Sequence, residues 1–298
     1  MTFHAASRDA LAAAELTLLD VLGSDAAKAS DTAKASDTAK AKPARTRKAA
    51  AGAPDQLGDE LFSVVRLLDA QIGLRRALGD SSAAPERREQ LLTGLLSGKV
   101  GDQTLRVLAA AVRERWSTPR ELVDGLDHLG RTALLVRAER EGRLDAVEDE
   151  LFRFGRIVAA DTDLEQALTD RSAPASAKSE LVRSLIADRS EPVTVALVEQ
   201  LVVAPQGRAL VPGLADLAAE AAKRRERSVA YVVSAGPLTA QQQQRLASAL
   251  DRIYARPIAL HVEVDPRIQG GLVIKVGDEV IDGSAVARID ELRRRLAG

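Results

Sequence analysis

Few segments of this 298-residue sequence carry residues whose types and spacing could do chemistry. The stretch GLLSGKV, which begins at Gly94, has some features of a phosphate-binding loop, in which backbone N–H groups cradle phosphates and a Ser or Thr ligates magnesium. Only three residues separate Gly94 from Gly98, however, and Val100 stands where the hydroxyl would be needed. We therefore interpret the stretch as an ordinary loop.

The remaining candidate groups do not form a recognisable constellation. His4, His128 and His261 are scattered, and although His261 shares a strand face with Glu263, two ligands on one strand do not complete a metal site. The many acidic residues lack the paired, apolar-framed arrangement that tunes a general acid. Because the chain has no cysteine, disulfides and thiolate chemistry are excluded. We predict no catalytic residue, no cofactor and no metal.

Composition favours a folded, helical protein. Apolar residues make up 46% of the chain and aromatic residues only 2%, which predicts helices packed through small and aliphatic side chains. The 42 basic residues nearly balance the 43 acidic ones, so no overall field attracts nucleic acid, and we expect none as a partner. The N-terminus carries Arg8, Asp9, Glu15 and Asp20 where a signal or membrane helix would be apolar, so no membrane span is expected.

Residues 25–56 have the composition of a linker, and we call them the tether. They contain ASDTAK twice and no Leu, Ile, Val or aromatic residue, so they cannot bury an apolar face. A flexible coil of this length reaches about 30 Å. Its excess of basic residues leaves contact with anionic lipid or nucleic acid open as an alternative to a solvated tether.

The chain also repeats itself over about 90 residues. The stretch DELFSVVRLLDAQIGLRRALGDSSA at Asp59 returns as DELFRFGRIVAADTDLEQALTDRSA at Asp149, and RELVDGLDHL at Arg120 returns as RALVPGLADL at Arg208. Apolar residues within each copy recur at helical spacing. We therefore predict two tandem helical bundles, residues 1–126 with the tether inside, and residues 127–228.

One segment of the second bundle is unusually apolar. PVTVALVEQLVVA, from Pro192 to Ala204, places apolar residues around more of its circumference than one buried face requires. It is either a central bundle helix or a helix that also forms one wall of a groove for a partner helix.

Residues 229–298 change to the period of strands. Ser228–Ala235, Pro257–Asp265, Gly271–Val276 and Glu279–Ser284 read as strands, with a helix between the first two that Thr239 can cap. Gly277 and Asp278 suit a hairpin tip, Gly270 and Gly271 a turn, and Ser284 the cap of a last helix whose Val286, Ile289, Leu292 and Leu296 face the sheet. The predicted fold is therefore mainly α with a small α+β C-terminal module.

This C-terminal stretch, VDPRIQGGLVIKVGDEVIDGSAVARIDELRRRL, resembles the signature of the delta subunit of F-type ATP synthases, also called the oligomycin-sensitivity-conferring protein. Upstream, VVSAGPLTAQQQQRL resembles the family's strand and helix start, so the likeness runs from about residue 127 to 298. The signature residues are Asp265, Pro266, Gly270, Gly271, Gly277, Asp278, Asp282 and Ser284.

The resemblance implies a peripheral-stalk subunit at the cytoplasmic face of the cell membrane, in which adhesion takes the place of chemistry. In that family the helical domain holds N-terminal helices of alpha subunits and the C-terminal part joins the b subunit. The partner-binding residues expected for the alpha helices are Leu134, Ala138, Val195, Val198 and Val202. Residues 293–295, all Arg, are expected either to meet an acidic stalk surface or to complement the end of their own helix.

This sequence departs from the family pattern by its extra helical bundle, so the resemblance leaves open which bundle binds the catalytic head. The second bundle, which adjoins the signature, is the better candidate. An RNA-binding adaptor like the helical antitermination factors is the alternative function, because such domains are also compact and all-helical and the tether is basic.

Overall fold

The computed structural model describes residues 3–35, 56–227, 229–254, 258–265, 267–268, 270–277 and 279–284. The chain divides into two compact units, residues 1–138 with 150–215, and residues 139–149 with 216–298. The last predicted helix, with Val286, Ile289, Leu292 and Leu296 and with residues 293–295, lies outside the described residues, as do Pro266 and Asp278.

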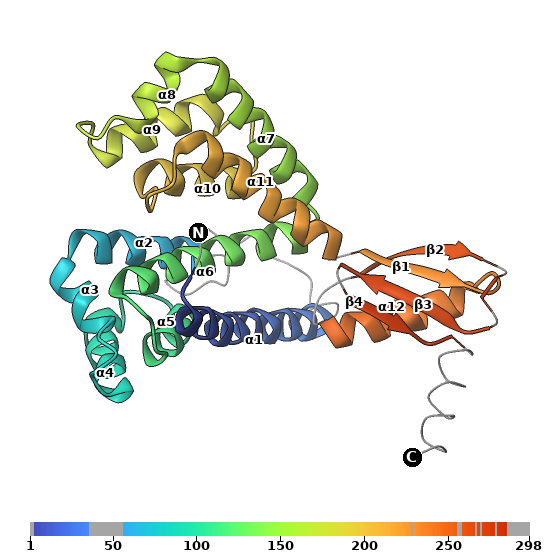
Figure 1. Ribbon diagram of the computed structural model, residues 1–298. Helices are drawn as coiled ribbons and strands as arrows, with labels where there is room; N and C mark the ends of the chain where they lie inside the picture. The colour runs from blue at the N-terminus through green and yellow to red at the C-terminus, as the bar shows by residue number, and fades with distance from the viewer. Residues whose placement is uncertain are drawn as a thin grey trace. The chain divides into compact units, whose positions relative to one another are not determined.

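Helices account for all of the described chain before the C-terminal sheet apart from short connections (Figure 1). In order they are α1 (Ala5–Ala35), α2 (Leu57–Ala70), α3 (Ile72–Leu78), α4 (Pro85–Leu96), α5 (Asp102–Arg113), α6 (Pro119–Arg140), α7 (Leu144–Ala160), α8 (Thr162–Thr169), α9 (Ala175–Ile186), α10 (Pro192–Val203) and α11 (Leu210–Arg227).

The core of the first bundle is built from α1 to α6. Buried residues of α1 recur every three or four positions, as at Ala10, Ala14 and Leu18, and this stripe packs mainly on α5. Trp116 fills the centre at 1% exposure, and its Nε1–H donates to the carbonyl of Ala111 at 2.8 Å. Small residues on α1 let the helices approach closely, which a chain with few aromatic residues needs.

Helix bounds carry the 90-residue spacing of the sequence repeat. Helix α9 begins and ends 90 residues after α4, and α10 does the same after α5. A tie inside each bundle follows the same spacing. The Glu60 carboxylate accepts from the Gly101 N–H (2.9 Å) and the Thr104 hydroxyl (2.5 Å), and the Glu150 carboxylate accepts from the Glu191 N–H (2.9 Å) and the Thr194 hydroxyl (2.6 Å).

Two helices run across positions where the sequence analysis placed boundaries. Helix α6 passes unbroken through residues 126 and 127, where the two bundles were expected to separate. Helix α1 continues to Ala35, through the first part of the expected tether. The alanines and lysines there have high helix propensity, so the backbone stays helical although the composition offers no apolar face. Residues 36–55 lie outside the described part of the chain.

The C-terminal unit contains a four-stranded mixed sheet in the order β2-β1-β3-β4. Strands β1 (Val229–Ser234) and β2 (Ala259–Val264) are parallel and joined by α12 (Ala240–Tyr254), while β3 (Leu272–Val276) and β4 (Glu279–Asp282) add antiparallel to β1. Figure 1 shows α12 along one face of this sheet. Ala230, Val232 and Leu250 form the core between them.

Local signals in this unit behave as predicted. The Gln242 N–H donates to the Thr239 hydroxyl (3.3 Å) and the Thr239 N–H donates to the Gln242 side chain (2.9 Å), which is a capping box at the start of α12. Gly270, Gly271 and Gly277 have φ of 80°, 86° and 58°, in the left-handed region that favours glycine. The mainly helical fold with a small mixed α/β end is confirmed.

Candidate partner-binding surfaces

Most of the side chains that were expected to bind a partner are buried in the protein core. Leu134, Ala138, Val198 and Val202 are between 0% and 4% exposed, and Val195 is half-buried. Helix α10 buries residues on most of its circumference, which accounts for its apolar sequence by packing within the chain. Contact of these residues with a partner stays a prediction, and of the five Val195 is the one that a partner could reach without displacing the bundle.

Leu134 is covered by a helix of the first bundle. A Cβ added to Gly58 of α2 would stand 2.7 Å from the Leu134 side chain, so α2 lies directly against α6 at this point. One turn along, a Cβ at Gly130 of α6 would stand 2.6 Å from the ring of Phe62. The two glycines therefore permit a close helix crossing, and Phe62 is buried there at 2% exposure.

The matching residue in the second bundle behaves differently. Phe152 lies 90 residues after Phe62 but is 56% exposed. Position 218, which matches Gly130 in the 88-residue alignment of α11 with α6, is alanine. The second bundle thus lacks a glycine at this matching position, and its Phe152 lies at the surface. Together with Ile157 (56% exposed) and Leu185 (40%), it adds apolar area to the second bundle.

A buried polar network joins the two bundles. The Asp127 carboxylate on α6 accepts from Gln200 Nε2 on α10 (3.0 Å) and from Arg208 Nη2 (2.8 Å). Gln200 Oε1 in turn accepts from Arg66 Nη1 on α2 (2.8 Å), and Gln206 Nε2 donates to the Asp69 carboxylate. We call Asp127, Gln200, Arg66, Arg208, Gln206 and Asp69 the junction network; Asp127 and Gln200 are each 1% exposed.

Burial also shifts pKa values at the junction. Desolvation, together with the nearby Arg131 and Arg208, lowers the pKa of His128 to about 4, although the charge of Asp127 opposes this. His128 is therefore neutral at physiological pH. Desolvation raises the pKa of Asp59 and lowers that of Arg66, because both side chains lose water between the bundles.

A second tie that the sequence did not reveal lies at the N-terminus. The Glu121 carboxylate on α6 accepts from the His4 backbone N–H (2.9 Å) and the Ser7 hydroxyl (3.1 Å), and it pairs with His4 Nδ1 (2.8 Å). Burial raises the pKa of Glu121, but these hydrogen bonds outweigh it and lower the pKa overall. His4 therefore has a structural role here, and more than a hundred residues separate the partners, a distance over which sequence pattern gives no signal.

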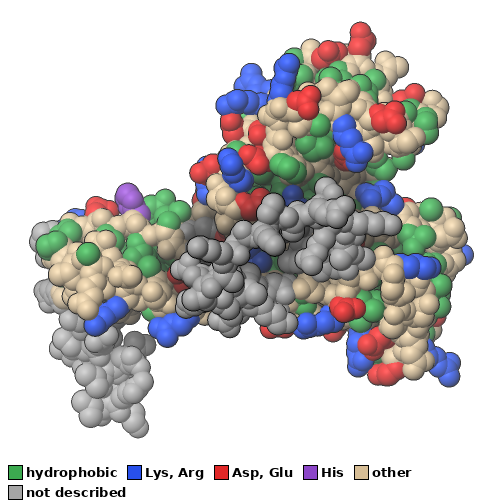
Figure 2. Space-filling model, turned by 180° about the vertical axis from the view of Figure 1, so that it is seen from behind, with side chains coloured by type: hydrophobic (Ala, Val, Ile, Leu, Met, Phe, Trp, Pro, Cys, Tyr) green, Lys and Arg blue, Asp and Glu red, His purple; other side chains and the backbone are tan. Residues whose placement is uncertain are grey.

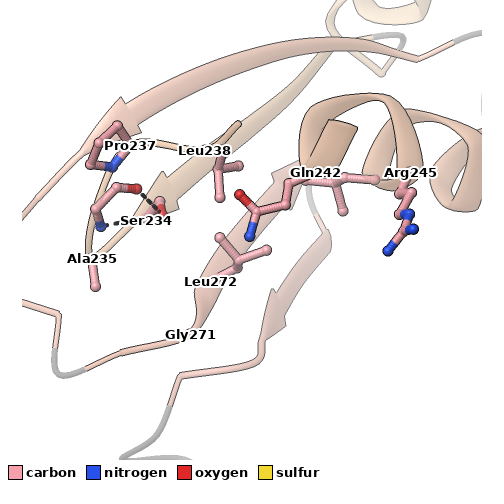
Figure 3. Close-up of a pocket in the computed structure, with 10 residues that line it drawn as sticks. Ser234, Ala235, Pro237, Leu238, Gln242, Arg245, Gly271 and Leu272 are labelled. Carbon is pink, nitrogen blue, oxygen red and sulfur yellow. Dashed lines mark hydrogen bonds between the residues drawn. The ribbon is translucent and has the colours of Figure 1, made fainter. Parts of the chain in front are cut away.

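The C-terminal unit carries an apolar hollow of about 590 Å³. It lies between the turn that follows β1, the start of α12 and the start of β3 (Figure 3). Leu238, Leu246 and Leu272 supply its apolar wall, while Gln242 reaches into it from α12 and Arg245 stands one turn further along the helix. Such a lining suits an apolar side chain of a partner with a polar or acidic neighbour.

Signature residues border this hollow as structural elements. Gly271 lines it, and a Cβ there would collide with the Gly283 carbonyl, so only glycine lets the chain pass. The Asp265 N–H donates to the Ser234 carbonyl (2.9 Å), and the Ser284 N–H donates to the Asp282 carboxylate (2.9 Å). The helix that Ser284 was expected to cap lies outside the described residues.

The described residues offer no constellation for metal chemistry, because no three histidine or acidic side chains among them could hold an ion. His261 instead meets the ring of Tyr231 edge-on at 5.5 Å. Gly94 lies inside α4, and Gly98 follows the helix end with φ of 74°, so GLLSGKV is a helix terminus followed by a turn. Within the part of the chain that the structure describes, no helix is both long and apolar enough to cross a bilayer.

Surface charge is mixed rather than concentrated. Figure 2 shows Lys and Arg side chains interspersed with Asp and Glu side chains on the visible face. Many of these charges pair, as where Arg183 meets both oxygens of Glu199 at 2.5 and 2.9 Å. Electrostatic attraction to a polyanion needs a concentrated basic surface, and this face does not supply one.

The helical bundles and the mixed sheet with its hollow define a mainly helical protein with a small α/β C-terminal unit, and comparison with known proteins identifies its family. Residues 132–296 match the family model described as ATP synthase delta (OSCP) subunit, which is more than half of the chain. The chain belongs to this family and is a non-catalytic peripheral-stalk subunit of an F-type ATP synthase.

Relatives named "ATP synthase subunit delta" extend the match beyond the family model. The chain is 49% identical to the one from Streptomyces griseus subsp. griseus over 82% of this chain and 90% of the relative, and 51% identical to the one from Nocardia farcinica over 80% and 89%. The relative from Rhodococcus opacus is 43% identical over 99% of both chains. That protein therefore shares the segment that precedes the family model.

Proposed function

We propose that the chain holds N-terminal helices of alpha subunits through its helical part and the C-terminal helix of the b subunit through its C-terminal unit. It would thereby tie the catalytic head to the stalk so that the head resists torque, at the cytoplasmic face of the membrane. Family membership together with the apolar hollow carries this proposal. We also infer that the first bundle is a duplicate of the second, because helix bounds and hydrogen bonds recur at the same spacing.

The second bundle is the proposed site for the alpha helix. Val195 stands half-buried on α10, and Ile157 and Leu185 add exposed apolar side chains on the same bundle. An amphipathic helix that covers such residues gains roughly 25 cal/mol for each Å² of apolar surface it removes from water. Binding of this kind needs no reacting group.

The hollow beside β1 is the proposed site for the b-subunit helix. Leu238, Leu246 and Leu272 can receive an apolar side chain, and the guanidinium of Arg245 can pair with an acidic residue one turn away on the partner. This supports a single partner helix lying across the start of α12.

Two titrations of the full chain test these assignments separately. An alpha N-terminal peptide and a soluble b-subunit helix are each labelled and followed by fluorescence anisotropy, and each is expected to saturate. Leu238→Glu is expected to weaken b binding at least tenfold and to leave alpha binding unchanged. Tyr231→Ser, on an exposed position of the same sheet, is the matched control and should change neither titration.

Absence of saturation with both ligands would overturn the proposed function. Saturation that weakens steeply with added salt would contradict apolar docking, because counterion release rather than burial would then drive binding.

A further inference from the structure

The junction network, unlike the other polar ties of the helical part, is not repeated in the two bundles. The ties of Glu60 and Glu150 occur once in each bundle, at matching positions. Among the residues that the structure describes, the junction network occurs once: Gln200 corresponds to Ala110, Asp69 to Ala159 and Asp127 to Ala215. These correspondences follow the 90-residue spacing, and the 88-residue spacing for α6 and α11.

The alanines show that folding of a bundle does not need this network. The first bundle packs α5 with alanine at position 110, and α11 lies in the second bundle with alanine at position 215. At these three pairs of positions the polar residue is the one where the bundles meet, whereas Arg66 and Arg208 have arginine at the matching positions 156 and 120 as well. The purpose of the three polar residues has to be sought in that meeting.

A buried polar network fixes the relative orientation of packed helices more than it adds to their stability. Apolar contact is non-directional, so two apolar surfaces can slide on each other at little cost. Here Asp127, Gln200 and Arg66 form a chain of hydrogen bonds across three helices, α6, α10 and α2. Any slip would leave a buried carboxylate or amide without its partner, which is costly, so the network admits one arrangement.

We propose that Asp127 and Gln200 are positioning residues that lock the second bundle onto the first in a single orientation. The lock makes the two bundles one stiff body, so that the second bundle, which carries the proposed site for the alpha helix, keeps a fixed orientation to the first. The use of this stiffness by a stator rests on the proposed function, whereas the orientation itself does not. Asp127 is the acceptor at the centre of the network. Gln200 donates to Asp127 and accepts from Arg66 of α2, so it connects the two helices.

The test measures the distance between the bundles directly. The chain has no cysteine, so nitroxide labels can be placed at Gln90→Cys on α4 and Glu180→Cys on α9, two exposed positions 90 residues apart. Pulsed electron spin resonance on the full chain is expected to give one narrow distance distribution. Replacing Asp127 and Gln200 together by alanine should at least double its width while the helical circular dichroism is kept.

Thr194→Ala is the matched control, because it removes a buried hydrogen bond within the second bundle only, and its distribution should stay narrow. If the double variant loses helicity, Gln200→Ala alone is measured, since Arg66 can then turn to water. A distribution that stays narrow in the folded variant would overturn the proposal. So would a distribution that is already broad in the unaltered chain, or one that the control broadens equally. None of these results bears on the peptide titrations, so the two proposals can fail separately.

Discussion

Replacing Gly130 by alanine puts the close crossing of α2 and α6 to a test in which two effects have opposite signs. Alanine in a helix interior is favoured over glycine by about 1 kcal/mol, so helix propensity alone predicts a more stable protein. The structure predicts the reverse, because the new Cβ would stand 2.6 Å from the ring of Phe62 and the ring would have to leave its site.

The internal repeat supplies the magnitude. Phe62 is 2% exposed against Gly130, whereas Phe152, in the copy that has alanine at the matching position 218, is 56% exposed. If Gly130→Ala drives Phe62 to a comparable position, about half of a phenylalanine surface, roughly 100 Å², returns to water. At 25 cal/mol per Å² this costs about 2.5 kcal/mol. After the gain in propensity, the net loss is about 1.5 kcal/mol.

Thermal and urea unfolding followed by circular dichroism measure this loss. A change of this size lowers the melting temperature by roughly 3–6 °C in a helical unit of about 200 residues. In a Phe62→Ala background the clash no longer exists, so Gly130→Ala should there stabilise by about 1 kcal/mol. A Gly130→Ala protein that is more stable than the original chain would refute the reasoning, because it would show that the ring is not held against that glycine.

Three further predictions follow from burial and hydrogen bonding. Val198→Asp is expected to unfold the second bundle, because it buries a carboxylate without a partner, whereas Val195→Asp should keep its helicity and weaken only the alpha-peptide titration. The folded pKa of His128, about 4, lies below the ordinary 6.5. The stability that neutral His128 contributes is therefore complete above pH 6.5 and falls as pH drops toward 4, by up to roughly 3 kcal/mol. Urea unfolding at pH 7 and pH 4.5 should show this loss in the original chain, and a His128→Gln protein should lose this pH dependence. Thr104→Val and Thr194→Val should each lower the free energy of unfolding by about 1 kcal/mol, and unequal losses would show that the two ties are not equivalent.

Local sequence signals predicted local structure. Glycine at position 277, between two β-rich runs, predicted a backbone with positive φ, and Thr239 as a cap predicted the start of α12. These features depend on neighbours within a few residues, so the local sequence contains the whole cause. The 90-residue repeat extended this reach, because it predicted that two sets of helices would share their breaks.

Features that depend on distant residues could not be read in this way. The burial of Val198 and Leu134 requires helices from elsewhere in the chain to lie over them, and no periodicity in α10 or α6 distinguishes cover by the same chain from cover by a partner. Asp127 and Gln200 are separated by 73 residues and resemble ordinary polar surface positions. Their one visible signal is that alanine replaces each in the other copy, and that signal has meaning only when the tertiary contact is known.

Helix α6 belongs to the packing of both bundles, and this places a constraint on how its length can change. Its first turns enclose Trp116 with the first bundle, Asp127 in its middle bonds to Gln200 of the second bundle, and no break intervenes over 22 residues. Adding or deleting one residue in the middle of such a helix rotates everything beyond it by about 100°. Loops on either side could accommodate an insertion, but an insertion within α6 would rotate a whole bundle about the helix axis. Among relatives, this segment should therefore vary by substitution and scarcely at all in length.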